Sequence, residues 1–466
     1  MVFSSNTFLF CFLPIMLLVY HIVRKEVRSF VLLLGSCLFY AWIEPKALIV
    51  LFSVILFSYG NGIVLSKCCL KVVRRIILIV AILINIGILV YFKYANFIIE
   101  IFNLLTSKGI ILQKIMLPLG ISFFVFQSIS YMVDIYRNEI KPEKNFVCLA
   151  LYFAMFPKVT QGPIMKYSAM IEDLQRMELQ TDDLYEGIRR FIIGISKKVL
   201  LADILGGVAD SIFSLAPTEL SVSLAWGGAF AYTLQIYFDF SGYSDMAIGL
   251  GRMFGFRLME NFNHPYISTS ITEFWRRWHI SLSCWFRDYI YIPLGGNRRG
   301  NQYINLLIVF IVTGIWHGAA LTFIIWGLFH GIIRIIEKWI SNKNITIKIP
   351  VILRWMITIL LVMIGWVLFR SSSLKEFFSF IKAMFGFGSV SPYTIGWFYN
   401  TKVIIVSIVA LLAAVSWKEL FPNIWCKWRD KNATQLIMRL ALLVMFIASI
   451  VLTMTSTYTS FIYFQF

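Results

Sequence analysis

Histidine is the side chain in this sequence best suited to acid–base chemistry, because imidazole titrates near neutral pH and can remove a hydroxyl proton. The chain has five histidines: His21, His264, His279, His317 and His330. His317 lies in the string Thr-Gly-Ile-Trp-His-Gly, at the junction of two apolar stretches. An ionisable group in such a setting usually lines a cavity or a pathway. We predict that His317 carries acid–base chemistry; the alternative is a structural histidine hydrogen-bonded between helices.

A second histidine, His279, lies in the string Glu-Phe-Trp-Arg-Arg-Trp-His-Ile. If this region forms one helix, a stripe of apolar residues lines one side of it, with His279 beside the stripe. The stripe consists of Trp275, Trp278, Leu282, Trp285 and Tyr289. Glu273 stands three and four residues before Arg276 and Arg277 and can pair with them. The structural alternative is an amphipathic helix at the membrane interface, which does not exclude a place in a cavity wall.

Charged residues near these histidines are candidates for binding an acyl donor or substrate. Arg298 and Arg299 follow a Pro-Leu-Gly-Gly-Asn turn and predict either headgroup anchoring or docking of the phosphates of a coenzyme or carrier. Asp239 and Asp245 stand at the end of an apolar stretch, where pairing with a nearby arginine is favoured over direct catalysis. The same group of candidates includes Arg276, Arg277 and Asp288.

Other chemistries find less support in the sequence. His330 lies thirteen residues after His317, about 140° away around one continuous helix, so the two cannot address the same atom unless that helix breaks. Cys284 lacks a paired base that would make it a nucleophile. The chain has no G-x-S-x-G, H-E-x-x-H or Walker A sequence. We therefore expect no metal site and no bound cofactor.

The elements that must position these residues belong to a membrane protein. Hydrophobic residues make up 59% of the chain and charged residues 14%, whereas a soluble chain is about 25% charged. At roughly 20 apolar residues per span, the apolar stretches predict an all-α polytopic protein with about eleven to thirteen membrane-embedded helices in one domain, residues 1–466. The net charge of +18 is typical of basic cytoplasmic loops and does not indicate nucleic-acid binding.

The distribution of positive charge predicts the orientation of the chain. Arg24, Lys25 and Arg28 follow the first apolar stretch, which places that end in the cytoplasm. The short turn at Glu44–Lys46 then falls outside, and the next basic loop falls inside. We therefore expect a multi-pass protein with an extracytoplasmic N-terminus.

Long strings around the two histidines resemble the membrane-bound O-acyltransferase (MBOAT) family, and within it the bacterial alginate O-acetyltransferase branch. The resembling strings are QIYFDFSGYSDMAIG (Gln235–Gly249), FWRRWHISLSCWFRDYIYIPLGGNRRG (Phe274–Gly300) and GIWHGAALTFIIWGLFHG (Gly314–Gly331). Shorter strings match in Met1–Phe12, Leu117–Asp134 and Phe156–Pro163. The resemblance is strongest over residues 1–370, whereas residues 371–466 are recognisable mainly by their apolar stretches.

The resemblance implies a single MBOAT-like domain whose helices surround a central cavity or tunnel reaching from the cytoplasmic face. It maps the two signature histidines of the family onto His279 and His317, with the second taken as catalytic. It implies acetyl-CoA as the acyl donor, a polysaccharide as the acceptor and an extracytoplasmic acetyl-accepting transferase as partner. The setting would be the bacterial cytoplasmic (inner) membrane and its lipids. Whether His317 acts as a general base or takes the acyl group itself stays open, and we favour the base.

Two other functions compete with polysaccharide O-acetylation. Within the same fold, the chain could transfer D-alanyl groups from a carrier protein to teichoic acid, although the Phe274–Gly300 string favours the acetylating branch. The alternative from another class is a transporter or flippase of a glycan precursor. The lack of an internal repeat and the small number of buried acidic residues count against transport.

Overall fold

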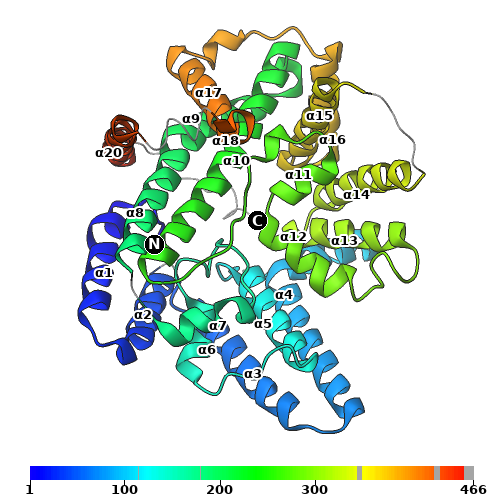
Figure 1. The fold of residues 1–466 in the computed structure, drawn as a ribbon. Helices are drawn as coiled ribbons and strands as arrows, with labels where there is room; N and C mark the ends of the chain where they lie inside the picture. Colours follow the sequence, from blue (N-terminus) through cyan, green and yellow to red (C-terminus); the bar gives the residue numbers. More distant parts are fainter. Residues whose placement is uncertain (43, 114, 179, 344–348, 424–430, 456–466) are drawn as a thin grey trace. The chain divides into compact units, whose positions relative to one another are not determined.

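The computed structural model describes residues 1–42, 44–113, 115–178, 180–343, 349–423 and 431–455, and the regular structure in these ranges is entirely helical, as predicted (Figure 1). The N-terminal α-helices are α1 Leu13–Ile22, α2 Lys25–Ala41, α3 Ala47–Lys67, α4 Lys71–Thr106, α5 Ile121–Tyr136, α6 Phe146–Ala154, α7 Tyr167–Arg176, α8 Thr181–Ser196, α9 Asp203–Phe213 and α10 Val222–Met253. The C-terminal ones are α11 Ile271–Arg277, α12 Ile280–Phe286, α13 Gln302–His317, α14 Leu321–Asn342, α15 Val351–Arg370, α16 Leu374–Lys382, α17 Thr401–Ala414, α18 Trp417–Leu420 and α20 Asn432–Thr455. Short π-helical turns span Phe8–Phe12, Lys197–Ala202, Arg287–Tyr291 and Ala383–Phe387.

The chain packs as two compact units. Unit 1 consists of Met1–Phe191 and Met246–Met259, and unit 2 consists of Ile192–Asp245 and Glu260–Phe466. Unit 1 has an aromatic core in which the ring of Phe39 lies 5.9 Å from that of Phe8 and 5.6 Å from that of Phe156. The candidate histidines His279, His317 and His330 all belong to unit 2. That residues 1–466 form a single domain stays a prediction.

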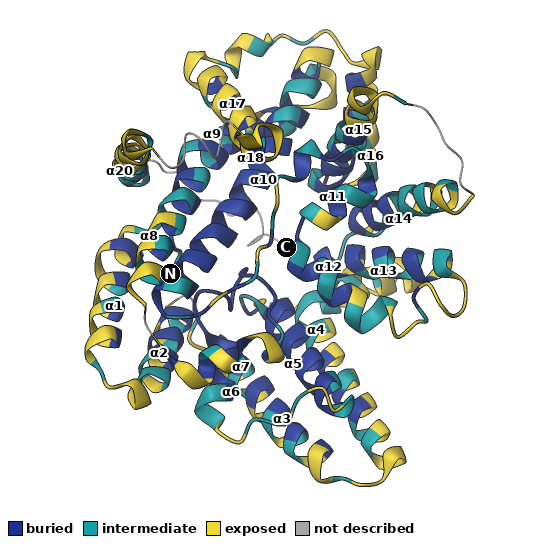
Figure 2. Ribbon diagram, viewed as in Figure 1, coloured by how far each residue is buried: buried dark blue, intermediate teal, exposed yellow. Residues whose placement is uncertain are grey.

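Several helices have the length and composition of membrane spans. Among the described residues, α3, α4, α15 and α20 are long and apolar enough to cross a bilayer. Shorter apolar helices include α5, α13 and α17. The apolar surface of α20 is largely exposed, as expected of a helix that faces lipid (Figure 2). The predicted total of about eleven to thirteen embedded helices and the central cavity stay predictions.

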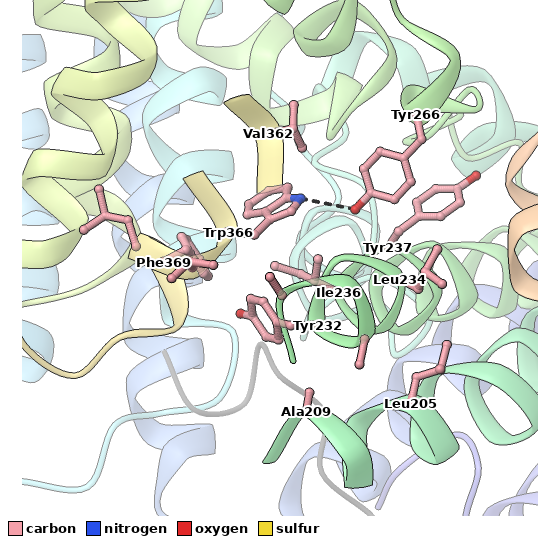
Figure 3. Packing of buried hydrophobic residues seen from close by; sticks show 14 of the residues in the cluster. Leu205, Ala209, Tyr232, Leu234, Ile236, Tyr237, Tyr266, Val362, Trp366 and Phe369 are labelled. Carbon is pink, nitrogen blue, oxygen red and sulfur yellow. Dashed lines mark hydrogen bonds between the residues drawn. The ribbon is translucent and has the colours of Figure 1, made fainter. Parts of the chain in front are cut away.

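The core of unit 2 is aromatic and surrounds the last part of α15. Trp366 of α15 donates a hydrogen bond from its indole nitrogen to the hydroxyl of Tyr266 at 3.2 Å (Figure 3). The ring of Phe369, one turn further along the helix, lies 5.8 Å from that of Trp366. Both side chains are buried. Since aromatic pairs pack with specific edge and face geometry, this core can fix the rings of neighbouring helices more narrowly than an aliphatic core would.

Glycines bring α13 and α14 unusually close together. The two helices run side by side (Figure 1). A Cβ atom built on Gly314 would lie 2.3 Å from the carbonyl oxygen of Phe323, and one on Gly327 would lie 2.3 Å from that of Phe310. Small residues of this kind allow close backbone approach in membrane proteins. The space that Gly314 leaves near His317 is therefore filled by a second helix.

Replacing Gly327 with alanine is expected to push α13 and α14 apart, because the Phe310 carbonyl oxygen cannot move away from the new Cβ atom without its helix. Overpacking of this kind costs about 1–3 kcal/mol of folding free energy. The measurement is the thermal unfolding midpoint of the detergent-solubilised protein. Gly87→Ala is the matched control, because a Cβ atom on Gly87 of α4 meets no atom within 4 Å. An unfolding midpoint that falls no more for G327A than for G87A would contradict the close packing.

Candidate active site

The structure places His279 at a break between two short helices, so the predicted continuous helix over this region is wrong. α11 ends at Arg277 and α12 begins at Ile280. His279 adopts the left-handed conformation, with φ 44° and ψ 55°, which residues other than glycine rarely adopt. A neighbouring segment binds the freed main-chain groups: Asn263 N–H donates to Arg277 C=O, and Ile280 N–H donates to Asn261 C=O. These bonds replace the helical bonds that the break removes.

The side chain of Asn261 also holds the break. Its oxygen Oδ1 lies 3.0 Å from Nδ1 of His279 and accepts from the main-chain N–H of Ser281 at 3.2 Å. Its nitrogen Nδ2 donates to Oγ of Ser244, on α10, at 3.1 Å. Asn261, His279 and Ser281 are all buried. The imidazole of His279 is therefore attached through Asn261 to α10.

Carboxylates fix the N-terminus of α11. Glu337 of α14 accepts hydrogen bonds from the main-chain N–H groups of Ile271 and Thr272, both at 2.7 Å. Negative charge at this end of a helix satisfies its free N–H groups and complements its dipole. Glu337 thus joins α11 to α14, the helix that carries His330.

Glu273 forms the ion pair with Arg277 that the sequence predicts, at 3.0 Å. Arg277 also pairs with Glu419 at 3.3 Å. Burial alone would raise the pKa of the Glu273 carboxyl, but hydrogen bonds from Thr269 and Arg277 lower that pKa below its ordinary value. Arg277 is therefore engaged in holding α11 in place, which argues against its predicted role in binding an acyl donor.

His317 is the last residue of α13 and lies among aromatic rings. Its imidazole lies 4.8 Å from the ring of Trp316, 5.1 Å from that of Trp326 and 5.1 Å from that of Phe369, measured between ring centroids. Its side chain is buried. Gly318, which follows, is extended rather than helical, and α14 begins at Leu321. The apolar junction predicted at His317 is thus a real helix end.

This helix end brings His330 into the same cluster, contrary to what one continuous helix would allow. The ring of Trp326 lies 5.1 Å from His317 and 5.0 Å from His330. Trp275 of α11 donates its indole N–H to Nδ1 of His330 at 3.4 Å. That bond occupies the lone pair of Nδ1. His330 therefore packs against Trp275 and Trp326. Its Nδ1 already accepts the hydrogen bond from Trp275.

The structure also brings His279 and His317 together, around Trp316. The centroid of the His279 ring lies 6.2 Å from that of Trp316, whose neighbour in sequence is His317. On another side, the ring of Phe240 from α10 meets His279 edge-on at 4.7 Å. Two imidazoles that lie far apart in the sequence thus share one buried aromatic cluster, formed by α10, α13, α14, α15 and the break after α11.

Asp239 and Asp245 form ion pairs with lysines, whereas the sequence favoured pairing with an arginine. Lys198 bonds Asp239 at 2.7 Å and Asp203 at 2.6 Å, and Lys197 bonds Asp245 at 2.7 Å. The exposed fraction of the Lys198 side chain is 1%. Both lysines stand in an otherwise apolar stretch, where a cation needs an acidic partner. These contacts give both aspartates a structural role.

Replacing Lys198 with methionine is expected to destabilise unit 2 severely, because the buried Asp239 and the partly buried Asp203 would lose their shared cation. Breaking a buried ion pair costs about 3–5 kcal/mol. The measurement is the fraction of protein that stays monodisperse in detergent after heating. The matched variant K198M combined with D203N and D239N removes both carboxylate charges and is expected to recover most of the stability. Equal losses in both variants would contradict this explanation.

Of the remaining predicted residues, the three arginines are exposed and Asp288 is partly buried. Arg276, Arg298 and Arg299 are exposed, with the last two in the turn after the π-helical segment Arg287–Tyr291. Asp288 pairs with Arg287 at 2.6 Å. The three exposed arginines are thus accessible to an anionic group, unlike the buried histidines.

Comparison with known proteins identifies the family. The family model described as "MBOAT, membrane-bound O-acyltransferase family" matches residues 88–374. The chain belongs to the MBOAT family. It is therefore a multi-pass membrane protein and an O-acyltransferase, as predicted.

Relatives of this MBOAT protein include acetyl and D-alanyl transferases. The "Probable alginate O-acetylase AlgI" of Pseudomonas putida is 41% identical over 100% of both chains. The "Peptidoglycan O-acetyltransferase" of Helicobacter pylori is 35% identical over 84% of this chain and 81% of its own. The "Teichoic acid D-alanyltransferase" of Bacillus subtilis is 31% identical over 48% of this chain and 60% of its own. Similarity to the acetylating proteins is thus higher and extends further.

Sequence reasoning about this MBOAT protein missed three residues that organise the cluster. Asn261 bonds His279, Trp326 packs against two histidines, and Lys198 holds two aspartates. A signal existed for Lys198, since two adjacent lysines interrupt an apolar stretch. For Asn261 and Trp326 no periodicity pointed to the contacts, because both depend on helix breaks. With its buried imidazoles and aromatic walls, the cluster can exclude water while a proton moves.

Proposed function

We propose that this MBOAT protein transfers an acetyl group from cytoplasmic acetyl-CoA across the membrane for O-acetylation of an extracytoplasmic polysaccharide. The observation that carries the proposal is the buried cluster in which Trp316 lies beside both His279 and His317. Imidazoles in a water-poor aromatic site suit a reaction that must move a proton without hydrolysing a thioester. The named activities of the alginate and peptidoglycan relatives support acetyl as the transferred group.

In the proposed reaction, His317 acts as general base. Its neutral imidazole takes the proton of the accepting hydroxyl as the hydroxyl oxygen attacks the acetyl carbonyl carbon. The carbon–sulfur bond then breaks, and the departing thiolate takes the proton back from the imidazolium. The products are an acetyl ester and free coenzyme A, and the histidine returns to its neutral form.

The donor would dock at exposed arginines. Arg298, Arg299 and Arg276 are exposed, and guanidinium groups bind phosphates well. Coenzyme A is too polar to cross a bilayer, whereas a two-carbon acyl group can pass through a narrow tunnel. We therefore assign these arginines to phosphate binding and the buried cluster to chemistry.

The setting follows from the charges on the loops. Arg24, Lys25 and Arg28 lie between α1 and the first turn of α2, which under the positive-inside rule is cytoplasmic. We accordingly propose the bacterial cytoplasmic membrane, with the N-terminus outside. The acetyl group would be received by an extracytoplasmic transferase partner that acts on the polymer.

A second candidate is D-alanyl transfer, which the similarity to a teichoic acid D-alanyltransferase over about half of the chain supports. Purified wild-type protein in proteoliposomes should release free thiol from acetyl-CoA in the presence of an acceptor. It should release none from a D-alanyl carrier protein. The opposite preference would overturn the acetyl assignment in favour of D-alanyl transfer.

A further inference from the structure

The side chain of Asn261 contacts both main-chain and side-chain groups at the helix break. Its oxygen Oδ1 faces three groups: Nδ1 of His279 at 3.0 Å, the main-chain nitrogen of Ser281 at 3.2 Å and Oγ of Ser281 at 2.9 Å. The exposed fraction of Asn261 is 0%. A buried side chain with this many short contacts has one orientation, so its two ends can be assigned from their partners.

The partners of Asn261 determine which end of its amide faces His279. The main-chain N–H of Ser281 can only donate, so the atom that it contacts must be the amide oxygen. The amide nitrogen then faces Oγ of Ser244, which can accept. The reversed amide would set two donors against each other at Ser281. The orientation therefore follows from hydrogen-bond chemistry.

This orientation determines the tautomer of His279. An amide oxygen can only accept, so Nδ1 of His279, 3.0 Å away, must carry a proton and donate it. In a neutral imidazole one nitrogen carries the proton and the other carries the lone pair. Neutral His279 therefore has its lone pair on Nε2, the nitrogen that can act as a base. His330 is arranged in the opposite way, because Trp275 donates to its Nδ1.

We propose that Asn261 is a positioning residue for acyl transfer: it holds His279 in the tautomer and orientation that make Nε2 a proton acceptor. The proposal rests on the acyl-transfer function proposed above and deepens it, because it makes Nε2 of His279 a hydrogen-bond acceptor beside His317, which stays the general base. The same contacts account for the left-handed backbone at His279, where the ring is fixed at the helix break rather than along a helix.

Among the described residues, the acidic side chains of α10 near this site are paired with lysines. On α10, Phe240 contacts His279, and the nearby Asp239 and Asp245 are bound to Lys198 and Lys197. Trp316 of α13 and Asn261 are neutral. A carboxylate introduced at position 261 would thus be a new acid in direct contact with the imidazole.

The test replaces Asn261 with aspartate and measures acetyl transfer in membranes as a function of pH. The variant N261D keeps an acceptor oxygen but lets the carboxyl–imidazole pair hold one more proton near neutral pH. While that proton sits on the imidazole, Nε2 of His279 has no lone pair to accept with. A nearby opposite charge shifts a pKa by about 1–3 units, so the acid limb of the profile should move to higher pH by about one unit or more. Asn263→Asp is the matched control, because Asn263 is exposed and its main chain makes the bonds to Arg277.

A second variant separates positioning from folding. Asn261→Ala removes the acceptor and is expected to lower kcat about 100-fold, because misplacing a catalytic group by about 1 Å has that effect. KM for acetyl-CoA should change little, and the variant is compared at equal amounts of monodisperse protein. An unshifted acid limb in N261D with wild-type kcat in N261A would overturn the role of Asn261. Acetyl transfer absent from the wild type would instead overturn the proposed function.

Discussion

Replacing His317 with glutamine is expected to reduce acetyl transfer from acetyl-CoA in isolated membranes by about 100-fold or more. General acid–base catalysis contributes about 10²–10⁴-fold to rates, and glutamine cannot take a proton near neutral pH. Glutamine is chosen because it is polar like histidine and its side chain is long enough to fill much of the space between Trp326 and Phe369. The measurement is the release of free thiol at equal protein levels.

The control for this variant is His21→Gln. His21 is exposed on α1, where its ring bonds the main-chain oxygen of Leu17. H21Q should release thiol at the wild-type rate. Wild-type activity in H317Q would contradict the role of His317 as general base. A burst of one thiol per H317Q molecule, followed by arrest, would place the acyl group on another residue and contradict it as well.

Replacing His279 with asparagine is expected to reduce acetyl transfer by a similar factor, about 100-fold, with little effect on folding. Asparagine adopts the left-handed conformation more readily than most residues, so the break between α11 and α12 should persist. Its amide can also donate to Asn261, but it offers no basic nitrogen. The loss of activity would therefore report on chemistry rather than on structure.

His264 offers a closely matched control for this second variant. It is also a left-handed histidine, with φ 43°, and its Nδ1 lies 3.2 Å from the main-chain oxygen of Ala414. H264N makes the same substitution in the same backbone conformation, and its activity should stay close to that of the wild type. Comparable activity in H279N and H264N would contradict a catalytic role for His279.

The sequence was sufficient to predict the membrane class and the helical fold, because both follow from composition and the length of apolar stretches. It also placed the helix end at His317, where two apolar stretches meet. The break at His279 was not predictable from periodicity, since the stripe from Trp275 to Tyr289 fits one helix well. Hydrogen bonds from the distant segment around Asn261 outweigh that local pattern.

Because periodicity describes single helices, it also missed contacts between distant elements in the candidate site. Pairing with arginine was expected for Asp239 and Asp245 because arginines are near in sequence, but the partners come from the segment between α8 and α9. His330 was set apart from His317 by helical geometry, and the break at Gly318 removes that geometry. Propensity and periodicity describe one element at a time, whereas these contacts join elements that are distant along the chain.

The most direct test of acyl transfer by His317 counts acetyl esters per sugar on the cell-surface polysaccharide, together with total polymer. Cells carrying wild-type protein and H317Q at equal membrane levels are compared. We predict that esters per sugar fall to background in H317Q while the amount of polymer is unchanged. If polymer falls while esters per sugar stay the same, the protein exports polymer, and a role for His317 in acyl transfer is contradicted.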